Sequence, residues 1–257
     1  MLFGDYFGCY FDVFDDIDFL IADKNLIYDN EEKYYSEKIL KLPDIWNCHS
    51  GFPFKREEPD LPFEKNKFIT FGSFNNFLKI SDEVISTWSK ILNKVKNSKL
   101  ILKSSLSYQT KNIISKFKEN GVDRQLEFFE RQNYSEVEDH LKLYKKIDIG
   151  LDTFPYNGVT TTFEALWVGV PVMVMKGYNF NSRCGESIVK NGNLDYFLAE
   201  NEEKYVEKAI YLANNVEELK SIRKKLFNNV LKTPLYDSKK FADGLTNELL
   251  KVYKREL

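Results

Sequence analysis

From residue 67 onward, short apolar runs alternate with longer stretches in which apolar residues recur every three or four positions. The apolar runs predict buried strands at residues 68–74, 99–105, 126–130, 146–152 and 171–175. The periodic stretches predict amphipathic helices at residues 81–96, 108–121, 134–146 and 161–169. Strands and helices that alternate in this way indicate a parallel sheet with helices on both faces. The predicted fold class is therefore α/β and Rossmann-like.

The two ends of the chain have different patterns. After residue 175 the pattern predicts a helical tail, with helices at residues 183–191, 202–214, 216–230 and 238–257. Near the N-terminus it predicts one strand at 17–23, one helix at 30–42 and a connector rich in proline and charge. One strand and one helix cannot bury a core alone. We therefore expect residues 1–62 to be the remnant of a neighbouring domain plus the connector, and residues 63–257 to form the Rossmann-like domain with its C-terminal helices.

Residues 151–171 carry the strongest functional signal. A predicted strand runs into a loop that contains Gly158, and Thr160, Thr161 and Thr162 then open a helix that carries Glu164. The first N–H groups of a helix lack partners and its dipole favours an anion. Threonine hydroxyls add donors for phosphate oxygens, and a carboxylate one turn further on can accept from ribose hydroxyls. The segment predicts a cradle for a nucleoside diphosphate.

A second interpretation of the same segment stays open. Thr161 and Glu164 have the spacing of a capping box, which would use both side chains only to complete the helix start. The predicted fold favours the cradle, because ligands of such sheets bind outside the carboxyl ends of the strands. Residues 75–79 and 157–162 both follow predicted strands and share that edge.

Composition excludes several classes of function. In this chain of 257 residues, 37 basic residues balance 39 acidic ones, so no electrostatic footprint for nucleic acid is present. Cys9, Cys48 and Cys184 lie far apart and are odd in number, which predicts reduced thiols in a cytoplasmic setting and no metal site. No apolar run approaches the ~20 residues that a membrane span needs.

Three segments resemble one enzyme family. They are ITFGSFNNFLKI at 69–80, LDTFPYNGVTTTFEALWVGVPVMVM at 151–175 and SRCGESIV at 182–189. Together they resemble the O-linked N-acetylglucosamine transferase family, with the plant Spindly-like and bacterial members nearest, from about Ile17 to about Leu226. The resemblance implies a GT-B glycosyltransferase, in which two Rossmann-like halves face a cleft and the C-terminal half holds most of the sugar nucleotide. This chain would be that C-terminal half.

The cradle and the resemblance together predict a donor site made of Asn76, Lys79, His140, Asn157, Gly158, Thr160, Thr161 and Glu164. The resemblance implies a catalytic role for Lys79, whose charge would neutralise the leaving diphosphate. It implies that Thr160 and Thr161 contact phosphate and that Glu164 contacts ribose. Asn76 and His140 would lie at the nucleotide end of the donor. Taken alone, Lys79 would be an exposed lysine and His140 a half-buried side chain on an amphipathic helix.

The chain departs from the family pattern at several positions. Val159 stands where the animal enzymes carry histidine, and Val137 and Leu143 replace the lysine and arginine that accompany His140 there. A Gly-Tyr-Pro-Gly-Thr-Ser/Thr-Gly loop should fall near residues 8–15, which read GCYFDVFD. The N-terminal half of the family, with its acceptor-side histidine and tetratricopeptide repeats, would precede residue 1.

These observations predict a glycosyltransferase of the O-GlcNAc transferase type, of which this chain supplies the donor-binding half. It would transfer sugar from UDP-N-acetylglucosamine or a related UDP-sugar, with inversion and without a cofactor or metal, to serine or threonine of a protein acceptor. The alternative is a non-catalytic UDP-sugar-binding module that acts with a partner chain, such as a separate N-terminal half or a repeat-containing protein. Another GT-B enzyme, such as a UDP-sugar epimerase, and a purely structural remnant also stay open.

Overall fold

The computed structural model describes residues 17–254 except for 54, 59, 105–106 and 131–136. The loop expected at residues 8–15 and Cys9 therefore lie outside the described residues. The central feature is a six-stranded sheet in the order β5-β4-β3-β6-β7-β8. Its strands are β3 (Ile69–Ser73), β4 (Ser98–Ser104), β5 (Leu126–Glu130), β6 (Ile149–Leu151), β7 (Val172–Met175) and β8 (Leu198–Ala199). The sequence predicted all of them except β8, whose two residues are too short for a pattern.

All neighbouring strands of this sheet run parallel. From β3 the chain builds outward through β4 and β5, and it then returns to the other side of β3 with β6, β7 and β8. β3 and β6 pair directly, with Phe71 opposite Ile149. The strand order thus reverses between β3 and β6, and in open α/β sheets such a switch point opens a crevice outside the carboxyl ends of the two strands.

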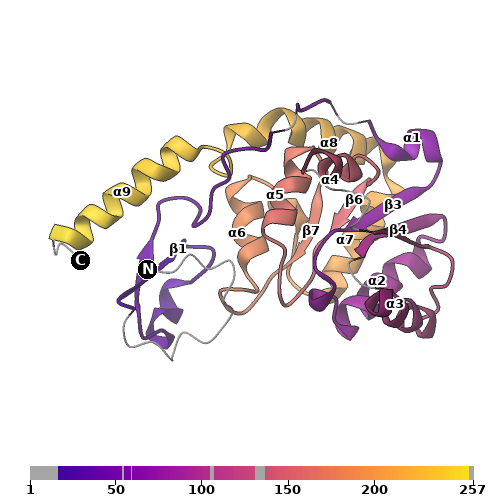
Figure 1. Ribbon diagram of the computed structural model, residues 1–257, viewed down its shortest axis with the longest axis horizontal. Helices are drawn as coiled ribbons and strands as arrows, with labels where there is room; N and C mark the ends of the chain where they lie inside the picture. Colours follow the sequence, from indigo (N-terminus) through magenta and orange to yellow (C-terminus); the bar gives the residue numbers. More distant parts are fainter. Residues whose placement is uncertain (1–16, 54, 59, 105–106, 131–136, 255–257) are drawn as a thin grey trace.

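Helices cover both faces of the sheet, as predicted (Figure 1). One face packs against α2 (Asp82–Lys94), α3 (Ser107–Glu119) and α7 (Glu202–Asn214), and the other against α4 (Val137–Tyr144), α5 (Thr160–Trp167) and α6 (Cys184–Asn191). Alternation along β4 explains the two cores, because Leu100 and Leu102 enter the first and Ile101 enters the second. The short α1 (Pro62–Asn66) precedes β3, and α8 (Val216–Asn229) follows α7. The α/β prediction is confirmed.

The N-terminal segment differs from the prediction. β1 (Phe19–Ala22) pairs in parallel with β2 (Lys38–Lys41), and a 3-10 helix, η2 (Asp29–Tyr34), joins them. The helix predicted over 30–42 is therefore wrong in its second half. The reason is tertiary: β2 finds a partner strand in β1, and strand pairing overrides the helical preference of a short segment.

The two-stranded sheet is covered on both faces. Leu20 and Ala22 lie in the same hydrophobic cluster as residues of α5 and α6. Ile21 and Leu40 face the other way and pack against Phe241 of α9 (Ser238–Lys254). The division of the chain at residue 62 stays a prediction, but these contacts join the N-terminal segment firmly to the helices of the larger sheet.

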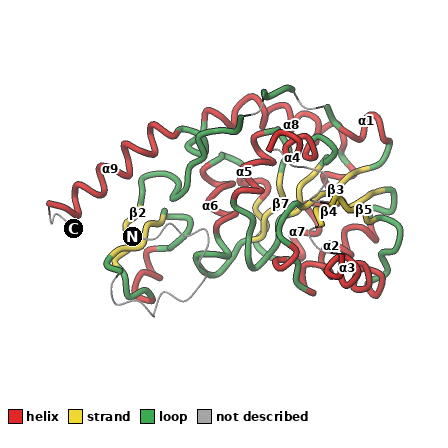
Figure 2. Tube along the Cα trace, in the orientation of Figure 1, coloured by secondary structure: helices red, strands yellow, loops and turns green. Residues whose placement is uncertain are grey.

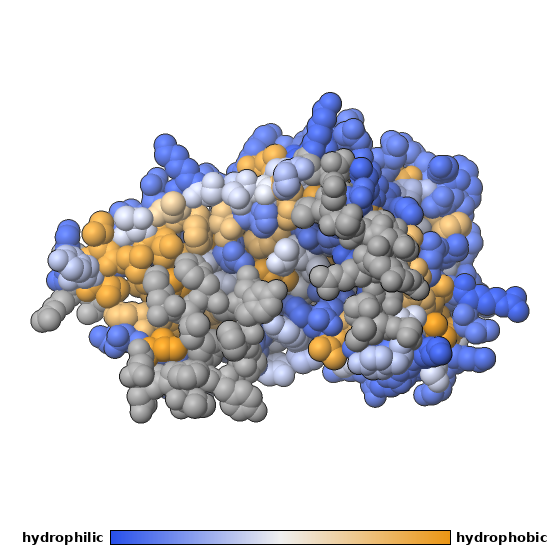
Figure 3. Space-filling view, in the orientation of Figure 1, coloured by the Kyte–Doolittle hydropathy of each residue, from blue (hydrophilic) through white to orange (hydrophobic). Residues whose placement is uncertain are grey.

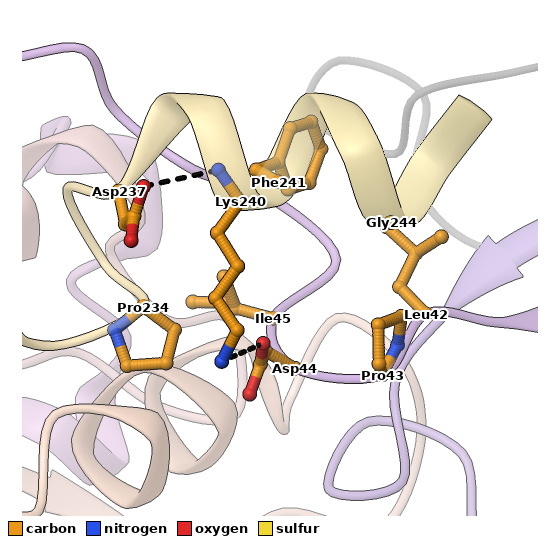
Figure 4. Close-up of a pocket in the computed structure, with 9 residues that line it drawn as sticks. All are labelled: Leu42, Pro43, Asp44, Ile45, Pro234, Asp237, Lys240, Phe241 and Gly244. Atoms are coloured by element: carbon orange, nitrogen blue, oxygen red, sulfur yellow. Dashed lines mark hydrogen bonds and ion pairs between the residues drawn. The ribbon is translucent and has the colours of Figure 1, made fainter. Parts of the chain in front are cut away.

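α9 extends from the body of the molecule across the two-stranded sheet (Figures 1 and 2). Its first turn is fixed in a small pocket, where Lys240 Nζ lies 2.7 Å from Asp44 Oδ2 and the N–H of Lys240 donates to Asp237 (Figure 4). Hydrophobic residues gather where α9 crosses this sheet, whereas the face around α1 to α3 is mostly hydrophilic (Figure 3). Within the part of the chain that the structure describes, every helix is too short or too polar to cross a membrane.

Candidate functional site

The candidate site lies at the switch point, where β3 and β6 end side by side. After β3, the chain turns through Asn75 into a 3-10 helix, η3 (Phe77–Lys79). After β6, it forms the loop 152–159 and enters α5. Sequence reasoning placed both segments at the same sheet edge, and the structure brings them into hydrogen-bond contact.

The start of α5 leaves its first donors open. The helix begins at Thr160 with Val159 as the N-cap residue, and no side chain of the described residues caps it. Thr161 is the second helical residue, and its hydroxyl donates to Asn75 Oδ1 at 2.9 Å instead of closing a capping box. The capping-box interpretation is therefore wrong. The N–H groups of Thr162 and Phe163 donate to the Val159 carbonyl, whereas those of Thr160 and Thr161 have no partner among the described residues and, with the positive dipole end, favour an anion.

Lys79 reaches the loop after β6 and holds one of its peptide groups. Its ammonium donates to the Asn157 carbonyl at 2.8 Å and lies 3.9 Å from the centre of the Tyr156 ring. The N–H of the same peptide unit, contributed by Gly158, donates to Asp152 Oδ1 at 2.7 Å. Lys79 and Asp152 thus hold the two polar ends of one peptide group.

Close packing explains the glycine and the asparagine of this loop. A Cβ added at Gly158 would lie 2.3 Å from Thr161 Oγ1 and 2.7 Å from Asn75 Oδ1, so a larger residue would displace the helix start. The Asn157 side chain is fully buried, donates to the Thr153 carbonyl and accepts from the N–H of Gly185. Asn157 therefore shapes the loop through its side chain and offers only its backbone to the crevice.

His140 and Glu164 form a second group at the same edge. His140 Nε2 lies 2.9 Å from Glu164 Oε2, which also accepts from the Tyr144 hydroxyl at 2.7 Å. His140 Nδ1 lies 2.9 Å from the Lys103 ammonium, which can only donate. Nδ1 therefore accepts, and the ring proton sits on Nε2 and points to Glu164. Lys103 of β4 supplies the cation next to His140 that the sequence comparison did not find at positions 137 and 143.

Two predicted residues lie at the rim. Asn76 is exposed, and its side-chain oxygen accepts from the N–H of Leu78, so it caps η3. Thr160 is exposed on the first turn of α5. Among the described residues, no hydrogen bond joins either side chain to the buried part of the site, and their roles toward a ligand stay predictions.

The sequence missed a buried polar pair beneath the crevice. Asp152 is 1% exposed, and its Oδ1 accepts from Asn75 Nδ2, from the N–H of Thr153 and from the N–H of Gly158. Burial raises the pKa of Asp152 to about 7, and the nearby Lys79 charge partly opposes this. A carboxylate directly after a buried strand and before a glycine loop is the signal that could have marked it.

The described residues contain no group of three histidine, cysteine or carboxylate side chains that could hold a metal ion. The positive charge of this site comes instead from Lys79, Lys103 and the α5 helix start. That the reaction proceeds without a metal stays a prediction from the sequence.

The fold and the site define a class of protein. A parallel sheet whose strand order reverses beside an open helix start is the nucleotide-site architecture of a Rossmann-like domain. The structure superposes on a point mutant of the Thermobaculum terrenum O-GlcNAc transferase with a TM-score of 0.75 and 26% identity, over 93% of this chain and 44% of that one. TarM of S. aureus shares the fold, with a TM-score of 0.56 and 14% identity. The chain has the fold of the C-terminal half of a GT-B glycosyltransferase.

The sequence comparison names the family. The sequence model of glycosyl transferase family 41 matches residues 55–245, and the chain belongs to this family. It is 33% identical to the probable UDP-N-acetylglucosamine–peptide N-acetylglucosaminyltransferase SPINDLY of Solanum lycopersicum, over 93% of this chain and 26% of that protein. It is 28% identical to the corresponding Arabidopsis thaliana protein SEC over 92% of this chain. The chain thus spans about a quarter of the length of these relatives.

Proposed function

We propose that this chain supplies the donor-binding half of a glycosyltransferase that uses UDP-N-acetylglucosamine or a related UDP-sugar. The observation that carries the proposal is the convergence of Lys79, the open start of α5 and Glu164 at the switch point of the sheet. The diphosphate would lie against the α5 N–H groups and Thr161, with Lys79 beside it. Glu164, oriented by His140 and Tyr144, would accept from the ribose hydroxyls.

The reaction proposed for the complete enzyme is an inverting transfer. The bond between the anomeric carbon and the diphosphate oxygen breaks, UDP leaves, and the oxygen of a protein serine or threonine bonds to the opposite face of that carbon while its proton passes to a base. Lys79 and the α5 dipole would stabilise the charge that develops on UDP without a metal. The names of the relatives, which are peptide N-acetylglucosaminyltransferases, support a protein acceptor.

Calorimetric titration with UDP in metal-free buffer tests donor binding. We expect micromolar affinity in the wild type and a loss of at least about tenfold in Lys79→Ala, because an ammonium–phosphate contact is a charge-assisted hydrogen bond. Lys94→Ala is the matched control, since Lys94 is exposed at the far end of α2. Unchanged affinity in Lys79→Ala would remove Lys79 from the site.

A non-catalytic module that binds UDP-sugar for a partner chain uses the same site, so turnover must distinguish the two. In the presence of a protein acceptor that carries serine and threonine, release of UDP from UDP-N-acetylglucosamine is measured with this chain alone and after addition of the N-terminal part of the catalytic region of a family member. Turnover only in the mixture supports the donor-half proposal. Binding without turnover in either case favours the module. The cytoplasmic location predicted from the cysteines stays a prediction.

A further inference from the structure

Asp152 differs from an ordinary buried carboxylate in how its two oxygens are used. Oδ1 accepts all three hydrogen bonds, at 2.7 to 3.0 Å, from Gly158, Thr153 and Asn75. Oδ2 is buried and has no hydrogen-bond partner among the described residues. It points toward Gly185 of α6, because a Cβ at Gly185 would lie 3.1 Å from it. Buried polar atoms without a partner are uncommon in native proteins, so Oδ2 calls for an explanation.

The charged and titratable groups that act on Asp152 come from three packed elements. Lys79 at the end of η3 lowers the pKa of Asp152 by its charge. Tyr144 of α4 and Tyr205 of α7 also interact with it, and burial raises the pKa of both phenols well above their usual range. Both tyrosines therefore stay neutral near pH 7. Asn75, in the turn after β3, and Gly185 of α6 face it without charge. Lys79 is the group whose loss would most change the ionisation of Asp152.

Lys79 and Asp152 are also coupled through one peptide group. Lys79 binds the carbonyl of the 157–158 peptide, and Asp152 binds the N–H of the same peptide. An anion that draws the ammonium toward itself takes Lys79 from the Asn157 carbonyl. It also cancels the field of Lys79 at Asp152 and adds negative charge beside the Gly158 loop. Each of these changes favours the neutral form of the carboxyl group.

We propose that Asp152 is a positioning residue of the donor site that takes up one proton when a nucleoside diphosphate binds. This inference rests on the proposed function. The proton comes from solvent and bonds to Oδ2, so Oδ1 retains its three donors and the loop keeps its shape. Asn75, held by Asp152, keeps its carbonyl oxygen directed at the Thr161 hydroxyl. The site thus absorbs part of the negative charge of the ligand without losing its geometry.

The sign of the pH dependence follows from this linkage. Because the pKa of Asp152 in the free protein is about 7 and binding raises it, the bound state holds more protons at and above neutral pH. Affinity for UDP therefore falls as pH rises from 7 to 8.5. Each unit by which UDP raises this pKa changes the affinity about tenfold between the two limits.

The test counts protons by calorimetry at pH 7.5, with UDP titrated in two buffers of different ionisation enthalpy. The terminal phosphate of UDP, with a pKa of about 6, contributes little at this pH. We expect the wild type to take up more than about half a proton per UDP. Asp152→Asn preserves the Oδ1 acceptor but cannot titrate, so it should bind UDP with no uptake and with a flatter pH profile. Asp148→Asn, at the other end of β6, should retain the uptake. Uridine, which lacks phosphate, should show none.

The outcomes separate this inference from the function on which it rests. A folded wild type that binds no UDP overturns both. UDP binding with equal proton uptake in the wild type and Asp152→Asn overturns the role of Asp152 alone. A thermal melt first shows whether Asp152→Asn folds. If it does not, the wild type decides by itself, because zero uptake or net release at pH 7.5 contradicts the proposal.

Discussion

Two aspartates, Asp148 and Asp152, flank β6, and their carboxylate oxygens differ in hydrogen bonding. At the amino end, both oxygens of Asp148 accept backbone N–H groups, from Phe63 and Thr70. Arg223, buried beside it, donates to the carbonyls of Ile147 and Asp148. At the carboxyl end, Asp152 has one oxygen without a partner among the described residues. Its nearby cation, Lys79, holds a loop that faces the crevice.

This difference distinguishes a structural contact at one end of β6 from a candidate binding site at the other. At the amino end, hydrogen bonds from Asp148 and Arg223 to backbone groups tie α1, β3, β6 and α8 together, although Arg223 Nε has no hydrogen-bond partner among the described residues. The carboxyl end keeps a half-buried lysine, together with a helix start that no described side chain caps and a carboxylate oxygen without a partner in the described part of the chain. A buried polar atom without a partner costs stability, and at the carboxyl end ligand binding could offset that cost.

The largest expected effect is at the amino end. Arg223→Met leaves the buried carbonyls of Ile147 and Asp148 without their charged donor and removes a positive charge that acts on Asp148, and we expect the loss of these two charge-assisted hydrogen bonds to cost about 3 kcal/mol or more. Urea unfolding should show this loss, while the UDP affinity of the folded fraction stays within about twofold. A stability loss under about 1 kcal/mol, or a matching loss of affinity, would break the distinction between the two ends.

Gly158→Ala tests the carboxyl end. The added methyl group meets Thr161 Oγ1 and Asn75 Oδ1, so it pushes the loop away from the start of α5. We expect UDP affinity to fall by at least about tenfold, since small displacements of a binding group are costly. Gly244→Ala in α9 is the control, because it adds the same methyl group far from the site. Equal affinities in both variants would show that the crevice geometry is not limiting.

Lys103→Met is expected to have the smallest effect. It removes the donor to His140 Nδ1 and frees the ring to change tautomer, so Glu164 loses one of its two partners and retains the Tyr144 hydroxyl. A hydrogen bond of this kind contributes about 1 kcal/mol, which corresponds to about fivefold in UDP affinity. Lys96→Met, an exposed position just before β4, serves as the control. Titration calorimetry with both variants measures the difference, and a variant that binds as the wild type does would make Lys103 dispensable.

Local patterns predicted most of the fold. The long strands and the helices each contain enough apolar residues to show their period, whereas β8 does not and β2 depends on its pairing with β1. The cradle was also visible, because its loop and helix start are contiguous. The residue pairs that complete the site were not visible in the sequence. Asn75 and Asp152 are 77 positions apart along the chain, and Lys103 and His140 are 37 apart. Such contacts arise from strand order, which a periodicity does not contain.

The proposed donor site is not the largest hollow of the described structure. A lysine-lined hollow of about 460 Å³ lies near the amino ends of the strands, with Lys65, Lys99, Lys145 and Lys146 around it. The cavity between β3, β6 and α5 is far smaller, about 20 Å³. In the hollow, Lys99 and Lys145 are already paired with Glu127 and Glu57, so part of its positive charge is used.

A crystal structure of the chain with UDP is the most direct test of the central claim, that the donor binds at the carboxyl ends of β3 and β6. We predict that the diphosphate lies at the start of α5, with phosphate oxygens within hydrogen-bond distance of Lys79 Nζ and of the Thr160 or Thr161 N–H. UDP bound in the lysine-lined hollow, or a diphosphate with no contact to α5, would contradict this account.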